Sequence, residues 1–285
     1  NSVSPAPRET NRRVPFGEIV WPAIDVPPHE VTRDMVGCEP GRKPMSVKIG
    51  DADDAPRAHR RIPNYYLDAR EYTIGDRRRQ APAWTPPTAG PTAEWLAGRP
   101  DDFPLVGVSY EEAVDLAEEI GKRLPDEFEH EWAARFAAQR RLPPAGDDAA
   151  AQPPPELVRV VPVSSIQFDR YDTDPPLVGL RSNVAEWTDS IPTYAAATSV
   201  SPVGADFGPL INLLGETLSE SLRTVRGGDD RVIHDSPRTD ATPSAESPRV
   251  PLIVFAREPG LGFRCARSAQ PRLKSTDFSR WVTAP

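Results

Sequence analysis

The sequence predicts one ordered core with few regular elements, surrounded by long extended arms and loops. Proline supplies 35 of the 285 residues, about 12% against a usual ~5%. Proline and glycine together stay below the share of about 25 to 30% that indicates disorder throughout a chain. A chain near 300 residues buries roughly three quarters of its unfolded surface, so it folds without disulfides or a structural metal.

The organisation along the chain follows from these composition shifts. Residues 1–33 contain six prolines and neither a helical nor a strand period, which predicts an extended proline-rich arm. The arm is too rich in apolar residues for a solvated linker, so we expect it to lie on a surface, its own or that of a partner. Residues 34–270 are predicted to form one domain, with a proline-rich excursion at 140–157 and a C-terminal tail at 271–285.

Three further segments of the predicted domain have local signals. Residues 80–102 read as a turn-rich stretch anchored by Trp84 and Trp95. The run Arg77-Arg78-Arg79 reads as a solvated turn, with a grip on phosphate or on an acidic partner as the alternative. Ser109 and Glu112 form a capping-box pattern that predicts a helix of about eleven residues, ending at Gly121.

A second helix is predicted directly after the first. Pro125 is placed to open it at its first turn, with acidic residues near its positive end. One side of this helix is apolar, and it consists of Phe128, Trp132, Ala133 and Phe136. The two helices together form an amphipathic pair.

Charge and cysteine content exclude several classes of function. The formal net charge is -8 and the pI is about 5.2, which argues against a nucleic-acid partner. No stretch approaches the ~20 apolar residues of a membrane span. Two cysteines, Cys38 and Cys265, exclude a disulfide scaffold and a four-thiolate zinc site. The sequence starts at Asn1, so we expect either a cut fragment or a periplasmic or secreted protein with its signal peptide or anchor removed.

Five separated blocks, in order, resemble the formylglycine-generating enzyme family, also called the sulfatase-modifying factor domain. The most specific is GKRLPDEFEHEWAAR at residues 121–135, within the longer run 103–135. The other four are YYLDAREYT at 65–73, SNVAEWT at 182–188, VRGG at 225–228 and LGFRCAR at 261–267. The resemblance implies an α+β fold, a variant of the C-type lectin fold with low regular secondary structure and long ordered loops. It also implies that the motif tryptophans and arginines lock loops through buried contacts.

The resemblance carries catalytic residues that this chain lacks. Oxidase members of the family bind copper through two cysteines, four and nine residues after the second glycine of R-G-G. Those positions are Val232 and Pro237 here, and neither side chain can ligate copper. Related sulfoxide synthases hold iron with three histidines, but the four histidines of this chain have no helical metal-ligand spacing. They are His29, His59, His130 and His234. We therefore predict that the chain is not an enzyme and holds no resident cofactor.

Calcium is the one metal for which the motif blocks offer candidate ligands. By resemblance these are backbone oxygens of Ser182 and Val184 and the carboxylate of Glu186. The family asparagine that completes this set corresponds to Gly179, so the alternative is that Glu186 is an internal acceptor paired with an arginine. Relatives with a disulfide pair the equivalent of Cys265 with the position of Ala117. We therefore expect Cys38 and Cys265 to be free thiols, with a Cys38–Cys265 disulfide as the alternative.

Three functions remain compatible with the sequence. The leading expectation is a non-catalytic structural or interaction subunit that docks on other protein subunits of a larger assembly, with a membrane-bound respiratory or photosynthetic complex as one such assembly. The first alternative is a metal-dependent oxidase of the superfamily with a relocated site. The second is a carbohydrate or peptide recognition module.

Overall fold

The fold is described from a computed structural model, which covers residues 32–41, 44–48, 57–138, 160–166, 169–192, 221–228 and 249–269. The chain divides into two compact units, residues 1–34 and 35–285, and the architecture below is that of the second unit. The proline-rich excursion at 140–157 and the tail at 271–285 lie outside the described residues, as does all but the end of the arm at 1–33. The predicted domain boundaries therefore stay predictions.

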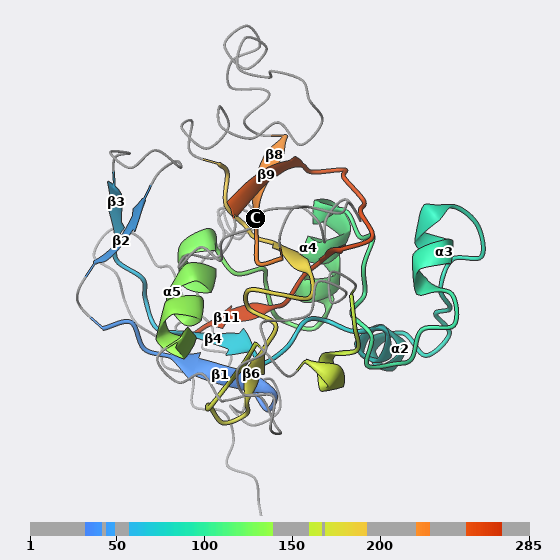
Figure 1. The fold of residues 1–285 in the computed structure, drawn as a ribbon, viewed down its shortest axis with the longest axis horizontal. Helices are drawn as coiled ribbons and strands as arrows, with labels where there is room; N and C mark the ends of the chain where they lie inside the picture. Colours follow the sequence, from blue (N-terminus) through green and yellow to red (C-terminus); the bar gives the residue numbers. More distant parts are fainter. Residues whose placement is uncertain are drawn as a thin grey trace, which may run out of the picture. The chain divides into compact units, whose positions relative to one another are not determined.

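Short strands form two small sheets and two hairpins in the described part of the chain (Figure 1). In the first sheet, β4 (Tyr65–Asp68) lies between β1 (Met35–Cys38) and β11 (Ala266–Ser268), antiparallel to both. The second sheet has the order β10 (Leu261–Gly262), β7 (Ala185–Trp187), β8 (Leu222–Arg226) and β9 (Arg249–Ile253). The hairpins pair β2 (Met45–Lys48) with β3 (Arg57–Arg60), and β5 (Arg170–Tyr171) with β6 (Leu177–Val178).

The first predicted helix is confirmed as α4 (Tyr110–Glu119). Ser109 is its N-cap: the Ser109 hydroxyl accepts from the Glu112 amide, and the Glu112 carboxylate accepts from the Ser109 amide. Its buried residues are Ala113, Leu116 and Ala117, on the face that the apolar spacing indicates. Gly121 follows with φ 71°, the left-handed conformation that ends a helix at glycine.

The second helix, α5 (Glu127–Ala138), begins later than predicted. Pro125 lies before the helix rather than in its first turn. Asp126 accepts from the Glu129 amide at 2.8 Å, and Glu129 accepts from the Asp126 amide at 2.9 Å, so this reciprocal pair fixes the start. On the predicted apolar side, the Trp132 and Phe136 rings stack with centroids 4.9 Å apart.

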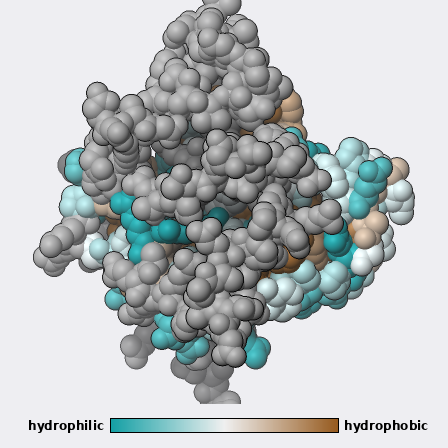
Figure 2. All heavy atoms as spheres, viewed as in Figure 1, coloured by the Kyte–Doolittle hydropathy of each residue, from teal (hydrophilic) through white to brown (hydrophobic). Residues whose placement is uncertain are grey.

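Two short helices were not predicted. The arginine run lies in α2 (Ile74–Gln80), so its reading as a solvated turn is wrong. A further helix, α3 (Pro91–Leu96), interrupts the stretch read as turns. Around α2 and α3, the face in Figure 2 shows hydrophilic and hydrophobic side chains interspersed. A 3-10 turn, η2 (Val163–Ser165), completes the set of described helical segments.

The core consists of two clusters of buried apolar side chains. One joins α4 to the four-stranded sheet and includes Trp187, Phe263 and Cys265. Trp84 and Trp95 pack against it, which confirms them as anchors of their segment. The other joins α5 to the three-stranded sheet and includes Tyr65 and Cys38. Among the described helices, none has the length and apolar content needed to cross a membrane.

Candidate functional site

The motif blocks meet at a buried ion pair between Arg264 and Glu186. The Arg264 Nε and Nη2 atoms each donate to one Glu186 oxygen at 2.7 Å, and both side chains are 0% exposed. Arg264 also donates to the carbonyl oxygens of Val178 and Asp68, so its guanidinium joins three segments. Burial opposes ionisation of Glu186, but Arg264 and His130 outweigh it and hold its pKa below the ordinary value.

His130 lies beside this pair rather than on the surface. Its Nε2 is 3.2 Å from a Glu186 oxygen, and its side chain is fully buried. Burial lowers the pKa of His130, so the ring is neutral at neutral pH. Among the described residues its Nδ1 has no hydrogen-bond partner. Of the four histidines weighed as candidate iron ligands, His130 is buried in packing and His59 is exposed on β3, while His29 and His234 lie outside the described residues.

Glu71 is a second buried carboxyl next to the ion pair. One oxygen accepts from the Asn183 amide at 3.1 Å, and the other has no partner within the described part of the chain. Burial raises the pKa of Glu71 to about 8, with Glu186 adding to the rise and Arg264 opposing it. Gly179 has φ 70°, and a Cβ at this position would collide with the Glu71 carboxylate. Glycine at position 179 therefore leaves the space that the buried Glu71 carboxylate occupies.

This arrangement does not fit calcium. The structure brings Ser182, Val184 and Glu186 together just before and within β7. However, both Glu186 oxygens are bound by Arg264, and the Ser182 carbonyl accepts from the Val184 amide at 3.0 Å. A calcium ion would have to share Glu186 with the guanidinium of Arg264, whose positive charge repels it. Glu186 is thus an internal acceptor paired with an arginine, the alternative that the sequence left open. In the regions with described side chains, no group of three or more His, Cys, Asp or Glu residues is placed to hold a metal.

The strand that leads to the family's catalytic loop ends on a second ion-pair cluster. Arg226, at the end of β8, pairs with Glu131 of α5, which also accepts from Arg135 at 2.6 Å. Gly228 then has φ 54°, and a Cβ there would lie 2.7 Å from the Ala185 amide nitrogen. Val232 and Pro237, the residues at the copper positions, lie outside the described residues, and by their chemistry neither fits a copper ion.

Both cysteines are free thiols in the core. Cys38 belongs to the cluster under α5 and Cys265 to the cluster under α4. Burial raises the pKa of Cys38 to about 12 and that of Cys265 well above its ordinary value. Because the thiolate is the form that attacks and binds metals, both residues are inert at neutral pH.

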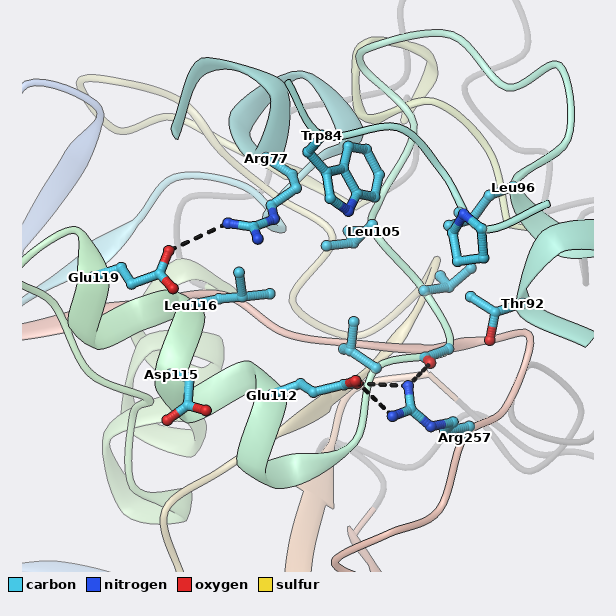
Figure 3. A pocket seen from close by; sticks show the side chains of 14 residues that line it. Arg77, Trp84, Thr92, Leu96, Leu105, Glu112, Asp115, Leu116, Glu119 and Arg257 are labelled. Carbon is cyan, nitrogen blue, oxygen red and sulfur yellow. Dashed lines mark hydrogen bonds and ion pairs between the residues drawn. The ribbon is translucent and has the colours of Figure 1, made fainter. Parts of the chain in front are cut away.

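A pocket of about 280 Å³ lies between α2, α4 and the segment that contains Trp84 (Figure 3). Its apolar lining includes Leu96, Leu105 and Leu116. Charged side chains surround that lining in two ion pairs. Arg257 binds both oxygens of Glu112 at 2.5 Å, and Arg77 lies 3.2 Å from Glu119.

The arginine run of α2 is engaged in ion pairs. Arg77 pairs with Glu119, Arg78 with Asp101 and Arg79 with Asp76. These carboxylates occupy the guanidinium groups that a phosphate or an acidic partner would need. The alternative of an open anion grip therefore finds no support in the geometry.

The chain matches the Sulfatase-modifying factor enzyme 1-like domain family over residues 23–269. Because this match covers most of the sequence, the chain belongs to that family. The expected α+β fold with sparse regular secondary structure is confirmed by the family match and by the short helices and strands described above. Comparison with curated proteins gives no match.

Solved structures show low identity to this chain. PvdO from Pseudomonas aeruginosa is 17% identical over 82% of this chain and 94% of its own, with a TM-score of 0.48. Treponema denticola variable protein 1 is 16% identical over 82% and 94%, with a TM-score of 0.47. CarF is 15% identical over 83% and 98%, with a TM-score of 0.43.

Sequence reasoning missed the second buried carboxyl and the pocket. Glu71 was read only as part of a strand motif, and its neighbours Arg70 and Tyr72 give no local signal of a buried acid. The pocket joins residues from position 77 to position 257, and no local pattern connects them.

Proposed function

We propose that this chain is a non-catalytic member of its family that acts as a structural or interaction subunit and docks on other proteins of a larger assembly. One observation carries the proposal: valine and proline stand where family oxidases place two copper thiolates. Copper(I) requires soft sulfur donors, and neither side chain supplies a donor atom.

The state of the two cysteines supports the same reading. Cys38 and Cys265 are the only cysteines in the sequence, and both are buried thiols with raised pKa values. A protonated thiol inside a packed core is a poor ligand and a poor nucleophile. The chain therefore has no described thiol that could take over the oxidase role.

The retained motif residues act in internal bonds. Arg264 and Glu186 satisfy each other, and the Trp187 indole donates to the Val108 carbonyl at 2.9 Å. These bonds join distant segments that have little regular structure of their own. The partners of these residues lie within the chain, so their presence does not by itself imply catalysis.

The interaction role rests on the composition of the proline-rich arm. Residues 1–33 combine six prolines with apolar residues that a solvated linker does not need. Proline restricts the free ensemble, so such a segment loses less entropy when it docks. Other protein subunits of a larger assembly are the partners in this proposal, with a membrane-bound respiratory or photosynthetic complex as one such assembly.

A turnover assay tests the catalytic half of the proposal. The full chain, loaded with Cu(I), is incubated in air with a cysteine-bearing sulfatase-type peptide, beside a copper-dependent family member as positive control. We expect no formylglycine by mass spectrometry from this chain. Product formation above the copper-only blank would contradict the non-catalytic assignment.

Purification from the native source tests the other half. We expect the chain to elute with stoichiometric protein partners in size-exclusion chromatography with light scattering. A compact monomer without any partner in pull-down experiments would argue against a subunit role.

A further inference from the structure

A turn after β9 exposes a phenylalanine to solvent. Phe255 is 68% exposed, the largest fraction for a large apolar residue in the described ranges. The Ala256 amide donates to the Ile253 carbonyl at 2.8 Å, which closes a β-turn around Phe255. The Val254 amide donates to the Ser221 carbonyl at 2.9 Å and attaches this turn to the sheet. The ring is therefore exposed on an anchored turn.

The same turn borders the pocket between α2 and α4. The Val254 carbonyl accepts from the Tyr110 amide at 2.9 Å, so the turn lies against the first turn of α4. Arg257, two residues after Phe255, lines the pocket and binds Glu112 (Figure 3). Two residues span at most about 7 Å of backbone, so the exposed ring and the rim of the pocket are neighbours.

The pocket has the size and the lining to receive a phenyl ring. Its apolar lining includes Trp84, Leu105 and Leu116, which Figure 3 shows around one space. An apolar cavity of about 150 Å³ already takes up benzene, so a pocket of about 280 Å³ is large enough for one phenylalanine side chain. The charged pairs around this lining give the polar rim that surrounds the buried anchor of a protein interface.

We propose that two copies of the chain form a two-fold dimer in which Phe255 of each copy occupies the pocket of the other. A two-fold interface uses the same patch on both copies, so the ring and the pocket that receives it must lie side by side. Their separation of two residues meets this requirement. Burial of both rings removes apolar surface from water, which favours association. The dimer is a contact between like chains and goes beyond the docking on other proteins proposed above.

Sedimentation velocity of the full chain between about 1 and 200 µM measures this association. We expect the mass to rise from one chain to two without larger species, because a two-fold contact closes on itself. Phe255→Ser removes the anchor and is expected to weaken dimerisation at least about tenfold. A monomer at every concentration, or an unchanged dimer in Phe255→Ser, would overturn the proposal.

Ile191→Ser is the matched control. Ile191 is the other large apolar residue that is exposed in the described ranges, at 49%, and it does not line the pocket. Its replacement is expected to leave the dimerisation constant within about threefold of the wild-type value. Equal weakening by the two substitutions would contradict the specific role of Phe255.

The indole N–H signal of Trp84, assigned by NMR from Trp84→Phe, reports on the pocket itself. It is expected to shift with concentration in the wild type and to stay at the monomer position in Phe255→Ser. The signal of Trp132, which packs against the other core cluster, is expected to stay constant in both. A dimer that forms without a shift of Trp84 would show that the ring enters a different site, against the proposal.

A final arm distinguishes a second copy from another protein as the source of the ring. N-acetyl-phenylalanine amide is expected to shift the Trp84 signal and to increase the fraction of monomer. If the chain stays monomeric while the amide still shifts Trp84, the pocket takes a side chain of another protein, and the dimer is excluded. The pull-down and turnover experiments above do not depend on the dimer, so its failure and that of the proposed function are separate results.

Discussion

At the scale of single residues, the Arg264–Glu186 pair is one contact on which the stability of several loops depends. Both side chains are fully buried, and Arg264 also serves two backbone carbonyls. Removing one partner of a buried pair leaves an uncompensated charge, which costs about 3 to 5 kcal/mol.

Arg264→Met is therefore expected to lower the free energy of unfolding by about 3 to 5 kcal/mol in urea denaturation. Arg78→Met is the control, because Arg78 and Asp101 form an exposed pair. Exposed pairs contribute about 0 to 1 kcal/mol, so this variant should unfold near the wild-type midpoint. Comparable losses in both variants would show that the buried pair has no special role.

The titration of Glu71 makes the free energy of unfolding depend on pH, and its raised pKa sets the direction. Its pKa rises from an ordinary 4.5 to about 8 in the folded chain, mainly through burial. A raised pKa means that folding favours the protonated acid. The contribution of Glu71 to the free energy of unfolding is therefore fully present below pH 4.5 and is lost as pH rises toward 8. Glu71→Gln imitates the protonated form and is expected to remove this part of the slope.

The measurement is the free energy of unfolding of both proteins between pH 4.5 and 8.5. Stability of the wild type should decline relative to that of Glu71→Gln as pH rises. A constant difference across this range would mean that Glu71 titrates as it does in the unfolded chain.

At the scale of elements, local sequence signals predicted what local forces build. Helix α4 has a cap, an apolar spacing and a terminal glycine within thirteen residues, and each functions as read. Helix α2 has a similar box between Thr73 and Asp76, but its seven residues contain no apolar period to accompany it. The start of α5 shifted because Asp126 and Glu129 cap it after Pro125.

The contacts that hold these elements together were beyond local reading. Arg264 lies 78 positions from Glu186 and Asn183 lies 112 positions from Glu71. The motif resemblance implied that arginines and tryptophans lock the loops, without saying which groups they meet. Only the fold determines those partners, and it also determines the pocket.

Alanine substitutions at two glycines distinguish the cost of left-handed backbone from the cost of a steric collision. Gly121→Ala puts a side chain into left-handed backbone with nothing nearer than Arg267 at 3.9 Å, and it is expected to cost about 1 to 2 kcal/mol. Gly228→Ala adds a Cβ 2.7 Å from the Ala185 amide nitrogen. Its loss of stability in urea denaturation should clearly exceed that of Gly121→Ala, and an equal loss would contradict the tight approach of β7 and the R-G-G turn.

At the scale of the whole molecule, the chain combines its family's scaffold with Val232 and Pro237 at the positions where the resemblance places copper cysteines. Calcium provides a first check on this view, because Glu186 is committed to Arg264. Adding millimolar calcium, or removing it with a chelator, is expected to leave the Tm unchanged. A calcium-dependent rise in Tm would show that binding to the folded state occurs after all.

Anaerobic titration of the reduced full chain with Cu(I), against a chromophoric competitor, tests the central claim most directly. Val232 and Pro237 offer no donor, and both cysteines are buried protonated thiols, so the competitor should retain all the copper. A copper-dependent family member in the same assay should withdraw one ion per chain. Stoichiometric withdrawal by this protein would contradict the account.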